Sequence, residues 1–171
     1  SVETVTLDAG SGTTSVGVIG TGTEIGAVSI GSDQNGGITL NGAITTNGAV
    51  TIDGPVTLAT GAISVTTAND AITFNHTIDG GQALTLVSGT AATAIQGEIG
   101  GNTAISSLTI TNGTANGTIE ISNIGGVTGA TAIGNTNTGT ITLDGTAYTT
   151  TGTQTYTCLL YTSPSPRDRN V

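Results

Sequence analysis

Few residues of this chain could take part in chemistry. Its titratable groups include one histidine, His76, and one cysteine, Cys158, together with eleven Asp or Glu residues against only two Lys or Arg. Acid–base catalysis needs such groups to converge in one place. Here the acids are scattered, and both basic residues, Arg167 and Arg169, lie at the C-terminal end. The sequence therefore predicts no catalytic site and no cofactor.

Two acids share a similar setting, because Asp53 and Asp144 each precede a glycine. Asp before Gly is typical of a turn in which the carboxylate bonds to nearby backbone, so we favour a structural role for both. His76 stands alone, which favours a surface or corner residue over a ligand. The calcium-binding nonapeptide GGxGxDxUx does not occur, and no spacing concentrates several carboxylates. We expect no metal site.

The charge balance excludes some partners. The formal net charge is −9, and residues 1–157 contain no Lys or Arg to neutralise phosphates. We therefore expect no binding to nucleic acid. No run of about 18 apolar residues is present, so we expect no insertion into a membrane. No leader is visible at Ser1, and both ends are expected to be cuts in a longer gene product.

One short unit recurs along the chain: an apolar residue, a small residue and a second apolar residue. Each unit makes a minimal strand whose two outer side chains lie on one face and whose middle side chain lies on the other. The units lie at 5–7, 16–18, 28–30, 38–40, 50–52, 63–65, 72–74, 84–86, 108–110, 119–121 and 141–143. Between them stand Asn-Gly and Asp-Gly pairs, which we expect to form corners with positive φ.

The spacing of these units predicts the fold. One series begins at residues 5, 28, 50, 72, 119 and 141, with a weaker unit at Ile95, and a second series at 16, 38, 63, 84 and 108 interleaves with it. The repeat of about 22 residues predicts an all-β, right-handed parallel β-solenoid of about seven coils, with two or more short strands per coil. A sandwich of antiparallel hairpins would explain the turns but not the spacing.

Longer similarities suggest duplication. Residues 48–66 align without gaps on residues 139–157, and residues 5–30 resemble residues 84–110. We expect a super-repeat of about 80 to 90 residues over the single coil. Each coil of a solenoid contacts only its neighbours, so such duplication is easily tolerated.

The composition changes abruptly at Cys158. The last residues contain two of the three prolines and every basic side chain. The string CLLYTSPSPRD resembles the translation of a sequencing-library adapter, which implies a non-native tail. We therefore divide the chain into a solenoid repeat fragment, residues 1–157, and an unstructured adapter-derived tail, residues 158–171.

The Thr- and Gly-spaced triplets, and above all the closing TTTGTQTYT at residues 149–157, carry a family resemblance. Residues 1–157 resemble repeat regions of very large bacterial exoproteins of the filamentous-haemagglutinin and autotransporter-adhesin type. The resemblance implies a non-catalytic shaft, secreted or held at the bacterial surface by an outer-membrane-anchored parent, with host-cell or abiotic surface receptors as partners. An isolated fragment is expected to self-associate through open solenoid ends.

Two other functions stay open. A Thr-rich solenoid can bind ice through ranks of Thr-x-Thr, a pattern found at 21–23, 109–111, 140–142 and 153–155, although these do not recur in every coil at one phase. A β-helix can also bind or cleave carbohydrate, which would need paired carboxylates and aromatic platforms. The chain has only one Phe and three Tyr.

Overall fold

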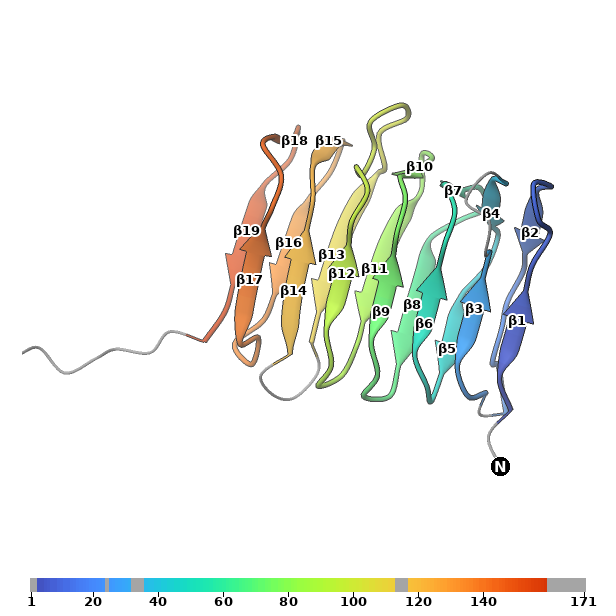
Figure 1. Ribbon diagram of the computed structural model, residues 1–171. Coiled ribbons are helices and arrows are strands. Elements are labelled where there is room, and N and C mark those ends of the chain that lie inside the picture. Colours follow the sequence, from blue (N-terminus) through green and yellow to red (C-terminus); the bar gives the residue numbers. More distant parts are fainter. Residues whose placement is uncertain (1–2, 24, 32–35, 113–116, 160–171) are drawn as a thin grey trace, which may run out of the picture.

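The computed structural model describes residues 3–23, 25–31, 36–112 and 117–159. Over these residues the chain is a parallel β-solenoid in which short strands stack side by side from the N-terminal coil to the C-terminal coil (Figure 1). The described residues contain nineteen strands and no helix. Three faces, called here sheets A, B and C, surround a common interior, and each coil visits them in that order.

Each sheet takes one strand, or one bridging residue, from each coil. Sheet A contains β1 (Val5–Leu7), β3 (Val28–Ile30), β6 (Val50–Ile52), β9 (Ile72–Phe74), β12 (Thr93–Ile95), β14 (Thr118–Ile121) and β17 (Thr140–Leu143). Sheet B contains β2 (Thr14–Val16), β4 (Ile38–Leu40), β7 (Val56–Leu58) and β10 (Ile78–Asp79), continued through a bridge at Ile99 to β15 (Ile124–Val127) and β18 (Tyr148–Thr150). Sheet C contains β5 (Ile44–Thr46), β8 (Ile63–Thr67), β11 (Ala83–Val87), β13 (Ser107–Thr111), β16 (Thr131–Gly134) and β19 (Gln154–Thr157), and a bridge at Ile19 extends it.

Every strand pair in the described residues is parallel, and its two strands lie one coil apart in sequence. Along sheet A the step in sequence is shortest from Ile72 to Thr93 and longest from Thr93 to Ile119. Seven coils result over the described part of the chain. The predicted parallel β-solenoid and its coil-length repeat are confirmed, and antiparallel hairpins are excluded for these strands.

The two interleaved series of the sequence correspond to three faces. The first series is sheet A, including the weaker unit, because Ile95 stacks on Phe74. The second series is wrong as a single column: Ile38 lies in sheet B, whereas Ile63 lies in sheet C. The corners between strands differ in length from coil to coil, and a sequence offset alone does not reveal which face a triplet occupies.

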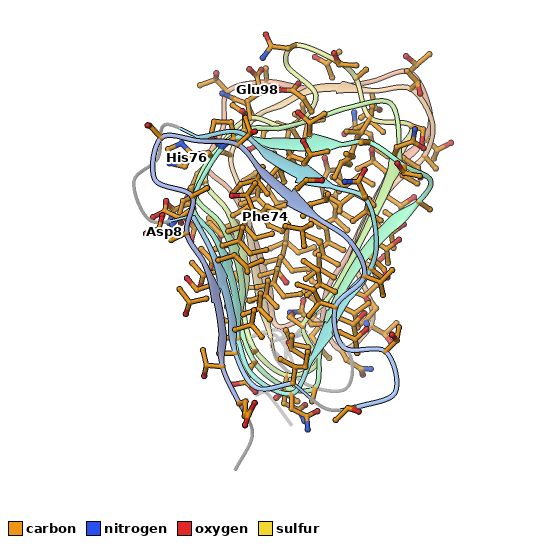
Figure 2. All side chains as sticks on the ribbon, turned by 90° about the vertical axis from the view of Figure 1, so that its right-hand side faces the viewer. Asp8, Phe74, His76 and Glu98 are labelled. Carbon is orange, nitrogen blue, oxygen red and sulfur yellow. The ribbon has the colours of Figure 1, made fainter. Side chains whose placement is uncertain are left out.

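The interior is an apolar column filled by alternate strand residues. The inward side chains of sheet A are almost all Val, Ile or Leu, and the chain's single Phe, Phe74, is fully buried among them (Figure 2). Phe74 lies between Ile52 and Ile95 of the neighbouring coils. Branched aliphatic side chains fit this narrow space because stacked coils lie only about 4.8 Å apart.

The corner between sheets C and A contains buried polar side chains. In successive coils Thr46, Thr67, Ser88 and Asn112 lie there, and each is at most 3% exposed. Thr46 Oγ1 donates to Gly48 O at 2.6 Å, and Asn112 Nδ2 donates to Ser88 Oγ at 3.0 Å and to a backbone carbonyl at 2.8 Å. These donors satisfy carbonyls that the turning chain leaves inside the protein.

Most Asn-Gly and Asp-Gly corners do not have the positive φ that we expected. Of the glycines in these pairs, Gly80 has it, at +112°, but Gly48, Gly54 and Gly145 do not. Glycine is required at these three positions by the neighbouring coil. A Cβ at Gly48 would lie 2.7 Å from Ala27 N. Close stacking of corners, rather than turn type, therefore selects glycine.

One of the two internal alignments preserves the faces. It pairs β6 with β17 in sheet A and β8 with β19 in sheet C, so the third and seventh coils correspond. The other aligns β1 of sheet A with β11 of sheet C and is no structural repeat. Of the predicted tail, Cys158 is exposed and Leu159 N donates to Thr138 O at 2.7 Å, and residues 160–171 lie outside the described residues.

Candidate functional site

A histidine and a carboxylate from adjacent coils approach each other at the corner that follows sheet A. His76 Nε2 lies 3.5 Å from Asp53 Oδ1 of the preceding coil, and Asn75 Nδ2 donates to the same oxygen at 3.3 Å. The side chains of His76 and Asp53 are 29% and 23% exposed. Figure 2 places His76 at the outside of the solenoid, on the same side as Asp8. Solenoid stacking thus brings together two residues that are a full coil apart in sequence.

The Asp53–His76 contact can orient the imidazole, and within the described residues no nucleophile bonds to this pair. A Ser-His-Asp or Cys-His arrangement needs a nucleophile in hydrogen-bond contact with the base. Over the described residues, neither His76 nor Asp53 forms a hydrogen bond with a hydroxyl or a thiol. The geometry fits a polar contact between two coils, whereas the sequence predicted that Asp53 bonds to local backbone.

Three other acids, Asp79, Asp144 and Glu98, lie at or beside corners. Asp79 Oδ1 accepts hydrogen bonds from Asn102 N at 2.8 Å and Thr103 N at 3.0 Å, so this carboxylate fixes the loop of the next coil. Asp144 lies in the exposed corner after β17. The side chain of Glu98 lies close to two glycines, Gly101 and Gly125. A Cβ at Gly101 would be 2.3 Å from Glu98 Oε2.

The described ranges provide neither a metal centre nor a membrane-spanning helix. Groups of three or more His, Cys, Asp or Glu that could hold a metal ion do not occur in them. Within the same ranges there is also no helix with the length and apolar character needed to span a bilayer.

The outer surface of sheet C is uncharged and has two parallel columns of outward side chains. Its strands contain no charged residue over the described part of the chain, whereas β14 of sheet A contains Glu120 and β10 of sheet B contains Asp79. Two outward columns cross it, defined here as the sheet C columns. The first column is Ser64, Thr85, Thr109, Ala132 and Thr155, and the second is Thr45, Thr66, Val87, Thr111, Gly134 and Thr157.

The sheet C columns change the interpretation of the Thr-x-Thr motifs. Thr109 and Thr111 point outward in register with Ser64 and Thr66 of an earlier coil, and Ile110 between them is fully buried. Hydroxyls therefore recur at one phase more regularly than the sequence suggested. Ala132 and Gly134 interrupt both columns in the sixth coil.

Two tyrosines lie at the C-terminal end of the interior, not on a face. Tyr148 stacks on Ile124, and Tyr156 stacks on Ile133. Gln154 joins them, because its Nε2 donates to Tyr148 O at 3.0 Å and its Oε1 accepts from Tyr156 OH at 2.8 Å. Burial, and then the proximity of Tyr148, raises the pKa of Tyr156. Gln154 therefore links the two tyrosines of the last coil through hydrogen bonds.

Comparison of the chain with protein-family models, with curated proteins and with solved structures found no match. Function must therefore be argued from the solenoid, its faces and its ends.

Proposed function

We propose that this chain is a structural and adhesive shaft segment of a large secreted or surface-exposed bacterial exoprotein, and that it is not an enzyme. One observation carries the proposal: inter-coil pairing continues through all seven described coils. A stack in which each coil contacts only its neighbours forms a long, stiff rod. Such a rod needs no site at which functional side chains converge. The resemblance of residues 1–157 to adhesin repeat regions supports export and exposure at the cell surface.

The side-chain inventory supports the shaft. In the described residues some carboxylates bond across coils, as Asp79 does, and others lie apart from one another, as Glu120 on sheet A and Asp144 at a corner do. The outer faces are rich in Ser and Thr. These residues stabilise a long exposed β-surface, so their abundance does not require a bound ligand. Receptors on host cells or abiotic surfaces are the partners that we propose, and no nucleic acid is among them because the net charge is −9.

The spacer role is tested by lengthening the rod. Duplicating residues 48–138 inserts four coils in phase, since Val50 and Ile141 occupy the same column of sheet A. Small-angle X-ray scattering should show a rod longer by about 19 Å, four times the spacing of about 4.8 Å, with an unchanged cross-section. A thicker particle of the same length would contradict the proposal.

The adhesive role is tested separately. Beads coated with the chain should adhere to epithelial cells or to glass and plastic more than beads coated with an acidic control protein of equal charge. Beads that show no excess adhesion would reduce the proposal to a spacer alone, without affecting the length test.

Binding to ice is the second candidate function, favoured by the sheet C columns. Outward side chains in these columns lie about 4.8 Å apart between coils and about 6.7 Å apart along a strand, with methyl and hydroxyl groups in both directions. Such an uncharged, regularly spaced array of hydroxyls can match ordered water where the columns are not interrupted. Thermal hysteresis that is lost in Thr109→Tyr but kept in Thr51→Tyr, a matched change on sheet A, would favour ice binding. No hysteresis in the unmodified chain would exclude it.

A further inference from the structure

Two identical Asn-Gly-Ala segments lie at the two ends of β5. Asn41-Gly42-Ala43 precedes this strand at the corner between sheets B and C, and Asn47-Gly48-Ala49 follows it at the corner between sheets C and A. Both asparagines are half-buried. Because the reacting residues are the same in both segments, the effect of the fold on their chemistry can be compared within one chain.

An asparagine that precedes a glycine is chemically labile. Glycine has no Cβ to shield its nitrogen, so this nitrogen can attack the side-chain amide carbon of the preceding asparagine. A bond forms between Gly N and Asn Cγ, the bond from Cγ to Nδ2 breaks, and ammonia leaves with the proton of the glycine amide. Water then opens the cyclic imide at either carbonyl and gives aspartate or isoaspartate. The reaction needs an asparagine side chain that is free to rotate toward the next nitrogen.

The side chain of Asn41 is held at both ends of its amide. Asn41 Nδ2 donates to Ser15 Oγ of the preceding coil at 3.0 Å, and Asn41 Oδ1 accepts from Thr60 Oγ1 of the following coil at 3.1 Å. Gly42 N donates to no acceptor among the described residues, so the nitrogen itself is available. Rotation of the amide toward Gly42 N would break both inter-coil hydrogen bonds, and stacking therefore opposes the reaction.

The side chain of Asn47 is not held in this way. Its backbone nitrogen donates to Ile25 O at 2.7 Å, but its amide forms no hydrogen bond within the part of the chain that the structure describes. The nucleophile is only weakly engaged, because Gly48 N lies 3.4 Å from Gly26 O, beyond the usual range for this type of bond. The attacking nitrogen and the attacked amide of this corner are therefore both available.

We propose that Asn47 is a site of spontaneous deamidation, and that inter-coil hydrogen bonds protect Asn41 from the same reaction. The product adds a carboxylate to an acidic chain, and isoaspartate also adds a methylene to the main chain. That methylene enters a corner without spare room, because a Cβ at Gly48 would already lie 2.7 Å from Ala27 N. Conversion of Asn47 to isoaspartate therefore loosens the contact between the corners that lead into β3 and β6.

Peptide mapping by mass spectrometry tests the proposal on the full chain, incubated at neutral pH and sampled over time. The mapping needs a protease that does not cut at Lys or Arg, because residues 1–157 contain neither. Asn47 should convert about thirtyfold faster than Asn41, since two hydrogen bonds must break before Asn41 can rotate. In a parallel sample unfolded in urea, the two asparagines should convert at similar rates.

A matched pair of variants tests the cause of the protection. Thr60→Val removes one of the two bonds to Asn41, so it should speed conversion of Asn41 about fivefold and leave Asn47 unchanged. Thr57→Val, an outward change on β7 of the same coil, should alter neither rate. Circular dichroism confirms that each variant is folded, and Ser15→Ala removes the other bond if Thr60→Val does not fold.

Four results would overturn the proposal. The first is a folded chain in which Asn41 converts as fast as Asn47 or faster. The second is a folded chain in which neither converts while the unfolded chain converts both, because stacking would then protect Asn47 as well. The third is an unfolded chain in which Asn47 keeps its full advantage, which would assign the difference to local sequence. The fourth is an equal effect of Thr57→Val and Thr60→Val on Asn41.

Discussion

Buried hydroxyls in this interior differ in whether they find a partner. Thr93 Oγ1 donates to Ser88 Oγ at 3.0 Å, and Thr67 Oγ1 donates to Asp70 O. Thr131 is only 1% exposed, yet its Oγ1 has no hydrogen-bond partner within the described structure. It lies in a column between Leu108 and Gln154. An unpaired buried hydroxyl costs about 1 to 3 kcal/mol, so Thr131 is a local weakness.

Replacing that hydroxyl should stabilise the protein. Thr131→Val keeps the shape of the side chain and removes the unpaired group, so we expect the free energy of unfolding to rise by about 1 kcal/mol. Thr93→Val, the matched control, removes a paired hydroxyl and should lower it by about 1 kcal/mol. Urea denaturation measures both values. Equal destabilisation by the two substitutions would show that Thr131 Oγ1 has a partner in solution.

Tyr156 makes stability depend on alkaline pH. Its pKa in the folded chain is raised by burial and by Tyr148. The neutral phenol is therefore favoured in the folded state, and its contribution is complete below pH ~10, the ordinary pKa of tyrosine. As the pH rises through the folded pKa, that contribution is lost. The difference in unfolding free energy between the unmodified chain and Tyr156→Phe should stay constant from pH 6 to 9 and move in favour of Phe above pH ~10. A constant difference up to pH 12 would contradict the raised pKa.

At the scale of elements, corners determine which strands can stack. A strand of three residues fixes two inward side chains, and the three corners of each coil must together bring the chain back to sheet A one coil higher. Where corners of neighbouring coils touch, no room remains for a Cβ. A Cβ at Gly97 would lie 2.2 Å from the carbonyl carbon of His76, whereas a Cβ at Gly81 would have nothing within 4 Å.

These two glycines give a matched comparison. Neither has a positive φ, so neither substitution forces Ala into the left-handed region. Gly97→Ala should lower the free energy of unfolding by about 1 to 3 kcal/mol because the coils must separate locally. Gly81→Ala should change it by less, or raise it by about 0.5 kcal/mol through the unfolded state. Thermal and urea denaturation measure both, and similar values would mean that the corner at His76 is loosely packed.

At the scale of the molecule, phase matters more than length. Deleting residues 72–92 removes β9, β10 and β11 together and places Thr93 in the column of Ile72. This variant should keep a cooperative transition, because each coil depends only on its neighbours. Deleting residues 72–82 removes only β9 and β10 and moves β11 of sheet C into the position of sheet A.

The out-of-phase deletion should lose cooperative unfolding, although it removes fewer residues. Circular dichroism and denaturant titration of the two variants measure this difference. If both deletions were tolerated equally, the faces would be interchangeable and inter-coil register would not control stability.

The sequence by itself determined the parity of each strand and the length of the repeat. Both follow from local alternation and from regular stacking, and they suffice for the solenoid and for sheet A, including Ile95. The rest depended on tertiary structure. The step from Ile38 to Val56 in sheet B is clearly shorter than the step from Leu84 to Leu108 in sheet C. Corners absorb such differences, so sequence offsets did not assign the second series to its two faces.

The same reason separates the expected site residues from the observed ones. The sequence placed His76 and Asp53 each at a corner. Their contact at 3.5 Å could be predicted only if the length of the coil between them were known. The glycines at corners were predicted from turn chemistry, yet packing of the adjacent coil selects Gly48. The outward Thr columns of sheet C likewise became visible only in the structure. Corners of different length keep the strands in register in space, although the spacing of these residues along the sequence varies.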